Sequence, residues 1–157
     1  MLTMSPNDQP DSTSLDFEVL KEPWNMYQIS DGSKVRIRCI LKDVRRVIED
    51  GMPKYSITVE GMIVVVCAPE LKGVPTTPAP AHDKLQESIE RADIAFDTIF
   101  YDNNDYILND GARIKIYLNL GEITRTTSYD SNGDRIYIIN HSATVNIKPP
   151  PQYSPQK

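Results

Sequence analysis

The chain has few cysteines, no excess of basic residues and no long apolar run. Cys39 and Cys67 are the only cysteines, too few for a disulfide framework or a tetrahedral cysteine site for zinc. Each lies in or beside an apolar stretch, so we expect two buried thiols in a reducing compartment. The longest apolar run, residues 62–68, is too short to span a bilayer, and residues 1–14 lack the features of a signal peptide. We therefore expect a soluble, cytoplasmic protein.

Signatures of catalysis and of cofactor binding are also missing. The sequence contains no phosphate-binding glycine loop, nucleophile elbow or paired His/Cys cluster. His141 stands alone on the apolar face of an expected strand, where a hydrogen-bonded structural role is commoner than a catalytic one. Asp130 begins an alternation of oxygen-bearing side chains like that of a calcium loop, but the glycine needed at the sixth place is Arg135. We predict no catalytic residues, no cofactor and no metal.

The net charge of −5 argues against a dedicated nucleic-acid-binding protein. The charge is unevenly distributed, however. Residues 1–23 sum to −4 and residues 67–111 to −6, whereas 24–66 sum to +2 and 112–157 to +3. The basic residues are thus concentrated in two separate blocks.

One strand–turn–strand sequence pattern occurs twice. Residues 27–41, YQISDGSKVRIRCIL, match residues 106–120, YILNDGARIKIYLNL, at a separation of 79 positions. With three extra residues allowed in the second copy, the match extends over about 55 residues and places Tyr55 on Tyr137. Alternating apolar residues resemble one another in any strand-rich chain, so chance similarity is the competing explanation. The shared Tyr and Asp-Gly positions favour internal duplication.

Each copy predicts four antiparallel strands. The first is LDFEVL or IAFDTIF, and the second is the short segment before Asp-Gly, a dipeptide typical of tight hairpin turns. The third, about 34–47 or 112–126, is long enough to require a bend or bulge. The fourth spans 54–66 or 135–147, and Gly61 within it predicts a bulge or a crossing point.

The segment between the copies is rich in proline and then predicts a short helix. Asp83 and Gln86 resemble a capping box, and Leu85, Ile89 and Ala92 would share one helix face. The predicted organisation is a disordered tail, a first β unit, a linker with a helix, a second β unit and a Pro-rich tail, with bounds 1–14, 15–69, 70–93, 94–150 and 151–157.

The predicted fold class is all-β with one short linker helix. Two tandem, similar four-stranded antiparallel units would form either paired small barrels or a pseudo-twofold β-sandwich. Four strands alone give a thin core, so we expect burial between the units or between subunits.

The third strands carry the candidate binding surface. At strand spacing, alternate residues point to one face, which gives a basic row in each copy: Lys34, Arg36 and Arg38 in the first, Arg113 and Lys115 in the second. Such a row suits phosphates or an acidic protein surface. The competing interpretation is a solvated face, with Asp16 and Glu18 across the sheet and long basic side chains protecting an edge from aggregation.

These observations favour a non-enzymatic binding or assembly module that presents two similar β surfaces to a protein partner or to itself, with no role for a membrane. Nucleic-acid or anion binding through the basic faces is the alternative. A third hypothesis is an enzyme with a pocket between the repeats, around His141, Tyr55 and Tyr137.

Overall fold

The computed structural model describes residues 12–153 and is almost entirely β-structure. The first half contains β1 (Thr13–Ser14), β2 (Phe17–Lys21), β3 (Asn25–Ile29), β4 (Lys34–Glu49) and β5 (Met52–Val66). A 3-10 turn (Pro69–Leu71) and helix α1 (His82–Glu87) follow. The second half contains β6 (Ile89–Arg91), β7 (Phe96–Phe100), β8 (Asn104–Leu108), β9 (Arg113–Tyr129) and β10 (Arg135–Lys148). The predicted all-β class is thereby confirmed.

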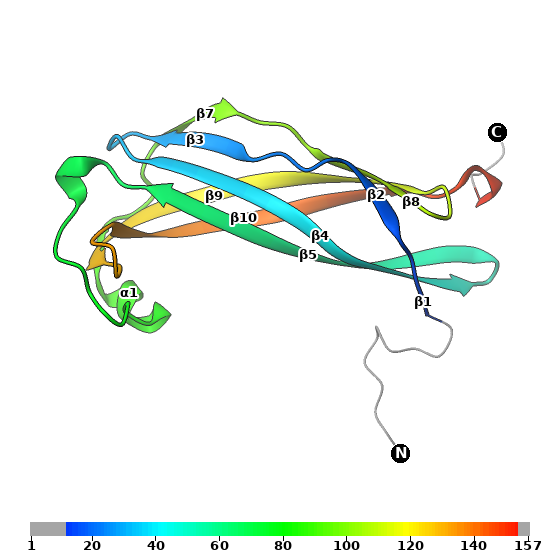
Figure 1. Cartoon of the computed structure of the whole chain (residues 1–157), viewed down its shortest axis with the longest axis horizontal. Helices are drawn as coiled ribbons and strands as arrows, with labels where there is room; N and C mark the ends of the chain where they lie inside the picture. The colour runs from blue at the N-terminus through cyan, green and yellow to red at the C-terminus, as the bar shows by residue number, and fades with distance from the viewer. Residues whose placement is uncertain (1–11, 154–157) are drawn as a thin grey trace, which may run out of the picture.

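The strands form two antiparallel sheets, each organised around one long hairpin (Figure 1). In sheet A, β5 pairs with the whole length of β4, so β3 and the short β1 share the other edge of β4. In sheet B, β10 covers one edge of β9, and β8 and β6 share the other. The β4–β5 and β9–β10 hairpins run along the longest dimension of the molecule.

Each half of the chain contributes one strand to the sheet of the other half. β2 pairs with β8 and so belongs to sheet B, whereas β7 pairs with β3 and belongs to sheet A. Among the described residues neither sheet closes on itself, so the two-barrel alternative finds no support. Because the halves exchange strands, neither sheet can form from one half alone.

A single hydrophobic core lies between the sheets. The inward-facing residues of β4 alternate with exposed ones and include Val35, Ile37 and Cys39; those of β9 include Ile114 and Ile116. All of these belong to one cluster, together with residues from β3 and β8. The expected burial between the two units therefore takes the form of one shared core.

The hairpin turns follow the predicted glycine chemistry. Gly32 and Gly111 adopt φ angles of +94° and +93°, a region that side chains disfavour, and each follows the aspartate of the repeated Asp-Gly. In the turn between β4 and β5, Asp50 and Gly51 both have positive φ, as a two-residue turn between twisted strands requires.

The bulge that we expected at Gly61 lies elsewhere. Gly61 pairs regularly with Cys39, and the register shift between β4 and β5 falls at Lys42, within the long strand. Gly61 instead accommodates a neighbour, because an added Cβ would come within 3.0 Å of the His141 ring. The glycine therefore allows β5 and β10 to approach each other.

The linker helix is shorter than predicted. α1 ends at Glu87, its N-cap is Ala81 with no side-chain hydrogen bond, and Ile89 already lies in β6. Pairing of β6 with β9 outweighs the helical pattern beyond Glu87. Ordered structure also reaches into both predicted tails, through β1 and a 3-10 turn at Pro151–Tyr153. The rest of those tails lies outside the described residues.

Candidate functional site

The five predicted surface residues lie on two different sheets. Lys34, Arg36 and Arg38 alternate along β4 with buried residues and therefore point away from the core on sheet A. Arg113 and Lys115 do the same on β9 in sheet B. The structure thus places the two basic rows in separate sheets.

Two of these cations have acidic partners, although not the predicted ones. Arg38 pairs with Glu22 at 3.2 Å, and its guanidinium lies 6.0 Å from the ring centre of Trp24. Arg113 pairs with Asp105 at 3.1 Å. The expectation that Glu18 lies across the sheet from the β4 row was wrong, because strand exchange carries β2 into sheet B, where Glu18 faces Ile107.

Three cations of the two rows have no acidic partner in residues 12–153: Lys34, Arg36 and Lys115. Lys34 and Arg36 are exposed neighbours on the outer face of β4 and line a shallow hollow of about 170 Å³ with Met26, Val66 and Ile99. These two charges therefore border an apolar surface.

β5 supplies the apolar part of this surface. Val66, Val64 and Met62 lie directly across from Lys34, Arg36 and Arg38, on the outer face of sheet A. Their side chains are 50%, 38% and 45% exposed. Isolated exposed apolar residues are ordinary, but three in a row on one strand form a patch. We call the outer side chains of β4 and β5 at these six positions the A face.

The matching surface of sheet B is polar. Lys148, Asn146 and Thr144 of β10 lie across from Arg113, Lys115 and Tyr117 of β9. A hollow of about 330 Å³ is lined there by the four charged and polar residues Arg113, Lys115, Asn146 and Lys148, with Ile147. The two sheets thus share a framework but present different chemistry.

The sequence contains a feature that corresponds to the apolar part of the A face. Alternation of polar and apolar residues stops after Gly61 and gives way to Met-Ile-Val-Val-Val. On its own this run is too short for a membrane span, and with Gly61 it predicts a bulge or a crossing point. In an edge strand it means instead that the outer side chains are apolar as well as the inner ones.

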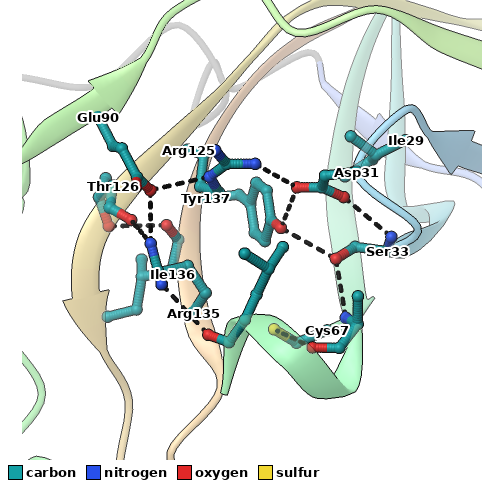
Figure 2. Close-up of polar contacts among 12 residues, drawn as sticks. Ile29, Asp31, Ser33, Cys67, Glu90, Arg125, Thr126, Arg135, Ile136 and Tyr137 are labelled. Carbon is teal, nitrogen blue, oxygen red and sulfur yellow. Dashed lines mark hydrogen bonds and ion pairs between the residues drawn. The ribbon is translucent and has the colours of Figure 1, made fainter. Parts of the chain in front are cut away.

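A polar network joins the two halves of the chain at the repeated turns (Figure 2). Asp31, in the β3–β4 turn, accepts hydrogen bonds from the Tyr137 hydroxyl at 2.6 Å and from Arg125 at 3.0 Å. The Ser33 backbone N–H donates to the other Asp31 oxygen at 2.9 Å. Arg125 also pairs with Glu90 at 2.9 Å.

The β8–β9 turn, in the second half of the chain, makes the corresponding contact with residues of the first half. Asp110, in the β8–β9 turn, accepts hydrogen bonds from Tyr55 at 2.7 Å and from Arg46 at 3.1 Å. Each aspartate therefore binds a tyrosine and an arginine from the other half of the chain. Tyr55 and Tyr137 match between the two copies, as do Arg46 and Arg125 at a separation of 79 positions, so the same pair of residue types joins the halves at both turns.

The ionisation of the Asp31 network fits a structural link. Burial alone would raise the pKa of Asp31, but the hydrogen bonds from Tyr137, Ser33 and Arg125 lower it, so the carboxylate stays charged. Burial and the bond to Asp31 raise the pKa of the Tyr137 hydroxyl. The Tyr137 hydroxyl therefore stays protonated and donates to the Asp31 carboxylate, which also accepts from Arg125.

His141 does not join the tyrosines. It lines a shallow hollow of about 270 Å³ with residues of β9 and β10, and neither Tyr55 nor Tyr137 lines that hollow. Within residues 12–153 the hollow beside His141 therefore does not include the two tyrosines that the enzyme hypothesis grouped with it.

The loop with alternating oxygens is a turn. One Asp130 carboxylate oxygen accepts hydrogen bonds from the backbone N–H groups of Asn132 and Asp134, at 2.8 and 3.0 Å. Among residues 12–153 no group of three His, Cys, Asp or Glu side chains has an arrangement that would hold a metal. No helix in the same range is long and apolar enough to cross a membrane.

Comparison of the chain with protein-family models, with curated proteins and with solved structures finds no match. Function therefore has to be argued from the surfaces themselves.

Proposed function

We propose that the protein is a non-enzymatic binding or assembly module that meets a protein partner, or itself, through the A face. The observation that carries this proposal is the row of exposed Met62, Val64 and Val66 beside Lys34 and Arg36, which have no acidic partner in residues 12–153. Apolar side chains bordered by charges are typical of protein-binding surfaces.

An internal duplication, which we infer from the sequence match and the strand order, supports this function. β3 and β8, like β4 and β9, begin 79 positions apart and hold the same places in their sheets. The exchange of β2 and β7 between the sheets and the contacts of Asp31 and Asp110 also relate the first half to the second in the same way. We infer two copies of one unit related by a pseudo-twofold axis. Such a framework allows the two outer surfaces to differ: the β5 positions of the A face are apolar, whereas the equivalent β10 positions of sheet B are polar.

Mass determination of the intact complex tests the proposal. Full-length wild-type protein and the variant Val64→Lys are purified from the native host at equal yield, and the mass of each native complex is measured. We expect the wild type to carry additional mass, either a second copy or a stoichiometric partner, and the variant to lose it. Wild-type protein that is monomeric and without partners at micromolar concentration would contradict the proposal.

Anion or nucleic-acid binding is the second candidate, because Lys34 and Arg36 are exposed and have no acidic partner in the described residues. In that case, oligonucleotide affinity falls steeply as salt rises and disappears in Lys34→Glu/Arg36→Glu. The matched control is Arg113→Glu/Lys115→Glu on sheet B. Affinity that does not depend on salt, or that both double variants retain, eliminates this candidate.

A further inference from the structure

We infer that the free edge of β5 pairs antiparallel with the same edge of a second protomer, centred on Val64, so that sheet A continues across a twofold dimer. This inference rests on the proposed function and deepens it, because it names the partner as a second copy and places the contact along the β5 edge of the A face.

β5 is an open edge along its apolar end. In residues 12–153 its only strand partner is β4, so the backbone groups of its other edge pair with no strand. Ile63 lies directly across from the fully buried Ile37 and therefore faces the core, yet its side chain is 38% exposed. A core-facing residue remains this open because, in the part of the chain that the structure describes, no strand lies beyond this edge. A further strand would cover it.

The same edge has none of the usual protection against pairing. Soluble proteins block edge strands with charges, prolines or bulges. Residues 62–66 contain five uncharged apolar residues, and their register with β4 is regular. This is the composition of a strand that pairs readily with another strand.

β10 is an internal control, because it holds the equivalent place in sheet B. At the positions that correspond to Met62, Val64 and Val66, β10 carries Thr144, Asn146 and Lys148. The common framework therefore does not require an apolar edge. The polar β10 edge is protected in the normal way, so of these two equivalent edges the β5 edge is the one suited to being covered.

Residues 62–66 are complementary to themselves. In antiparallel pairing about a twofold axis at Val64, Val64 faces its own counterpart, Met62 faces Val66 and Ile63 faces Val65. The twofold axis is perpendicular to the sheet, so both protomers present the same face on the same side. The outer residues Met62, Val64 and Val66 therefore lie beside outer residues of the second protomer. The two β4 strands would lie about 14 Å apart, three strand spacings, which exceeds the Debye length of roughly 8 Å in physiological salt. Repulsion between the two Lys34–Arg36 rows is therefore weak.

The size of the contact sets the expected strength. A pairing of five residues buries less than the roughly 1,200 Å² of a standard interface, so we expect a dissociation constant in the micromolar range. Salt should strengthen the dimer, because it screens the residual repulsion between the cation rows and between two chains of net charge −5. Anion binding by the same face has the opposite salt dependence.

Sedimentation equilibrium of the full chain provides the first test. We expect a monomer–dimer equilibrium for the wild type that shifts toward dimer between about 0.05 and 0.5 M salt. Val64→Lys, and the milder Val64→Asn that copies β10, should weaken dimerisation at least tenfold. Asn146→Lys, the matched change on β10, should leave it unchanged. Urea unfolding of each variant verifies that the fold is intact, since position 64 is partly exposed.

A cysteine at the proposed axis tests the register. Directly opposed residues in antiparallel strands have Cα atoms about 4.5–5.5 Å apart, within the range that a disulfide bridges. Val64→Cys should therefore form a covalent dimer when oxidised glutathione accepts the two thiol electrons. The control Thr58→Cys, an exposed position in the other half of β5, should not. The natural thiols Cys39 and Cys67 are buried and do not compete.

The remaining outcomes are distinguishable. A protein that stays monomeric but binds a different protein in a manner that Val64→Lys abolishes overturns this inference and leaves the proposed function standing. Open-ended polymers overturn it as well, because they indicate pairing of β5 with a different edge. A dimer that Val64→Lys does not weaken, or in which Val64→Cys forms no cross-link, also refutes it.

Discussion

Replacing Tyr137 with phenylalanine tests whether the Asp31 network links the two halves of the fold. The hydroxyl donates to the Asp31 carboxylate at 2.6 Å and lies 2.9 Å from the Ser33 hydroxyl oxygen. The Ser33 oxygen in turn accepts from the Ala68 N–H. A hydrogen bond to a charged acceptor contributes about 1.5–3 kcal/mol, and burial of the carboxylate makes its loss costly. We expect Tyr137→Phe to lower the free energy of unfolding by about 2 kcal/mol.

Urea denaturation followed by circular dichroism measures this change. With a slope of about 2 kcal/mol per molar urea, the midpoint should fall by roughly 1 M. Tyr117→Phe is the control, because its hydroxyl makes no hydrogen bond with residues 12–153, and its midpoint should not move.

A double-mutant cycle then identifies the partner. Tyr137→Phe and Asp31→Asn should show coupling of about 1 kcal/mol or more, whereas Tyr137→Phe and Asp110→Asn, in the other network, should be additive within roughly 0.5 kcal/mol. A Tyr137→Phe midpoint equal to that of wild type would refute the structural role assigned to the network.

Three further predictions concern the second network, pH and the turns. Tyr55→Phe should cost about 1.5–3 kcal/mol in urea unfolding, because Tyr55 donates to Asp110 as Tyr137 does to Asp31; a cost below 0.5 kcal/mol would contradict the reciprocity. The pKa of Asp31 is lower in the folded protein than in the unfolded chain, so its contribution is present above the unfolded pKa and is lost as pH falls through the folded pKa. Stability measured from pH 5 downward should therefore fall less steeply in Asp31→Asn than in wild type, and equal slopes would count against this. Gly32→Ala forces a side chain into φ +94° and should cost about 1–3 kcal/mol in the same unfolding assay, whereas Thr58→Ala at an exposed position of β5 should cost less.

Much of the local structure could be predicted from the residues alone. The Asp-Gly turns, the four predicted strands of each half and the long third strands all follow from alternation and turn chemistry, which are local properties. Gly61 and the linker helix were predicted less well. Gly61 looked like a bulge because its tertiary neighbour, His141, is invisible in the sequence, and the helical pattern through Ile89 gave way to pairing with β9.

The candidate binding surface could likewise be predicted only in part from the sequence. Alternation placed Lys34, Arg36 and Arg38 on one face, because period two determines the side of a strand on which a residue lies. It could not show which acids would reach them, since that depends on strand exchange between the halves. It also could not show that residues 62–66 form an uncovered edge rather than a buried strand, since both read as an apolar run.

The sequence by itself determined the strands, the turns and the side of each strand that carries charge. Only the tertiary structure decided which strands pair, why the repeated Asp, Tyr and Arg positions exist, and that the apolar end of β5 lies open. The physical reason is that turn geometry and side-chain alternation act between neighbours in the chain. Strand exchange, the reciprocal carboxylate contacts and edge exposure join residues as many as 106 positions apart.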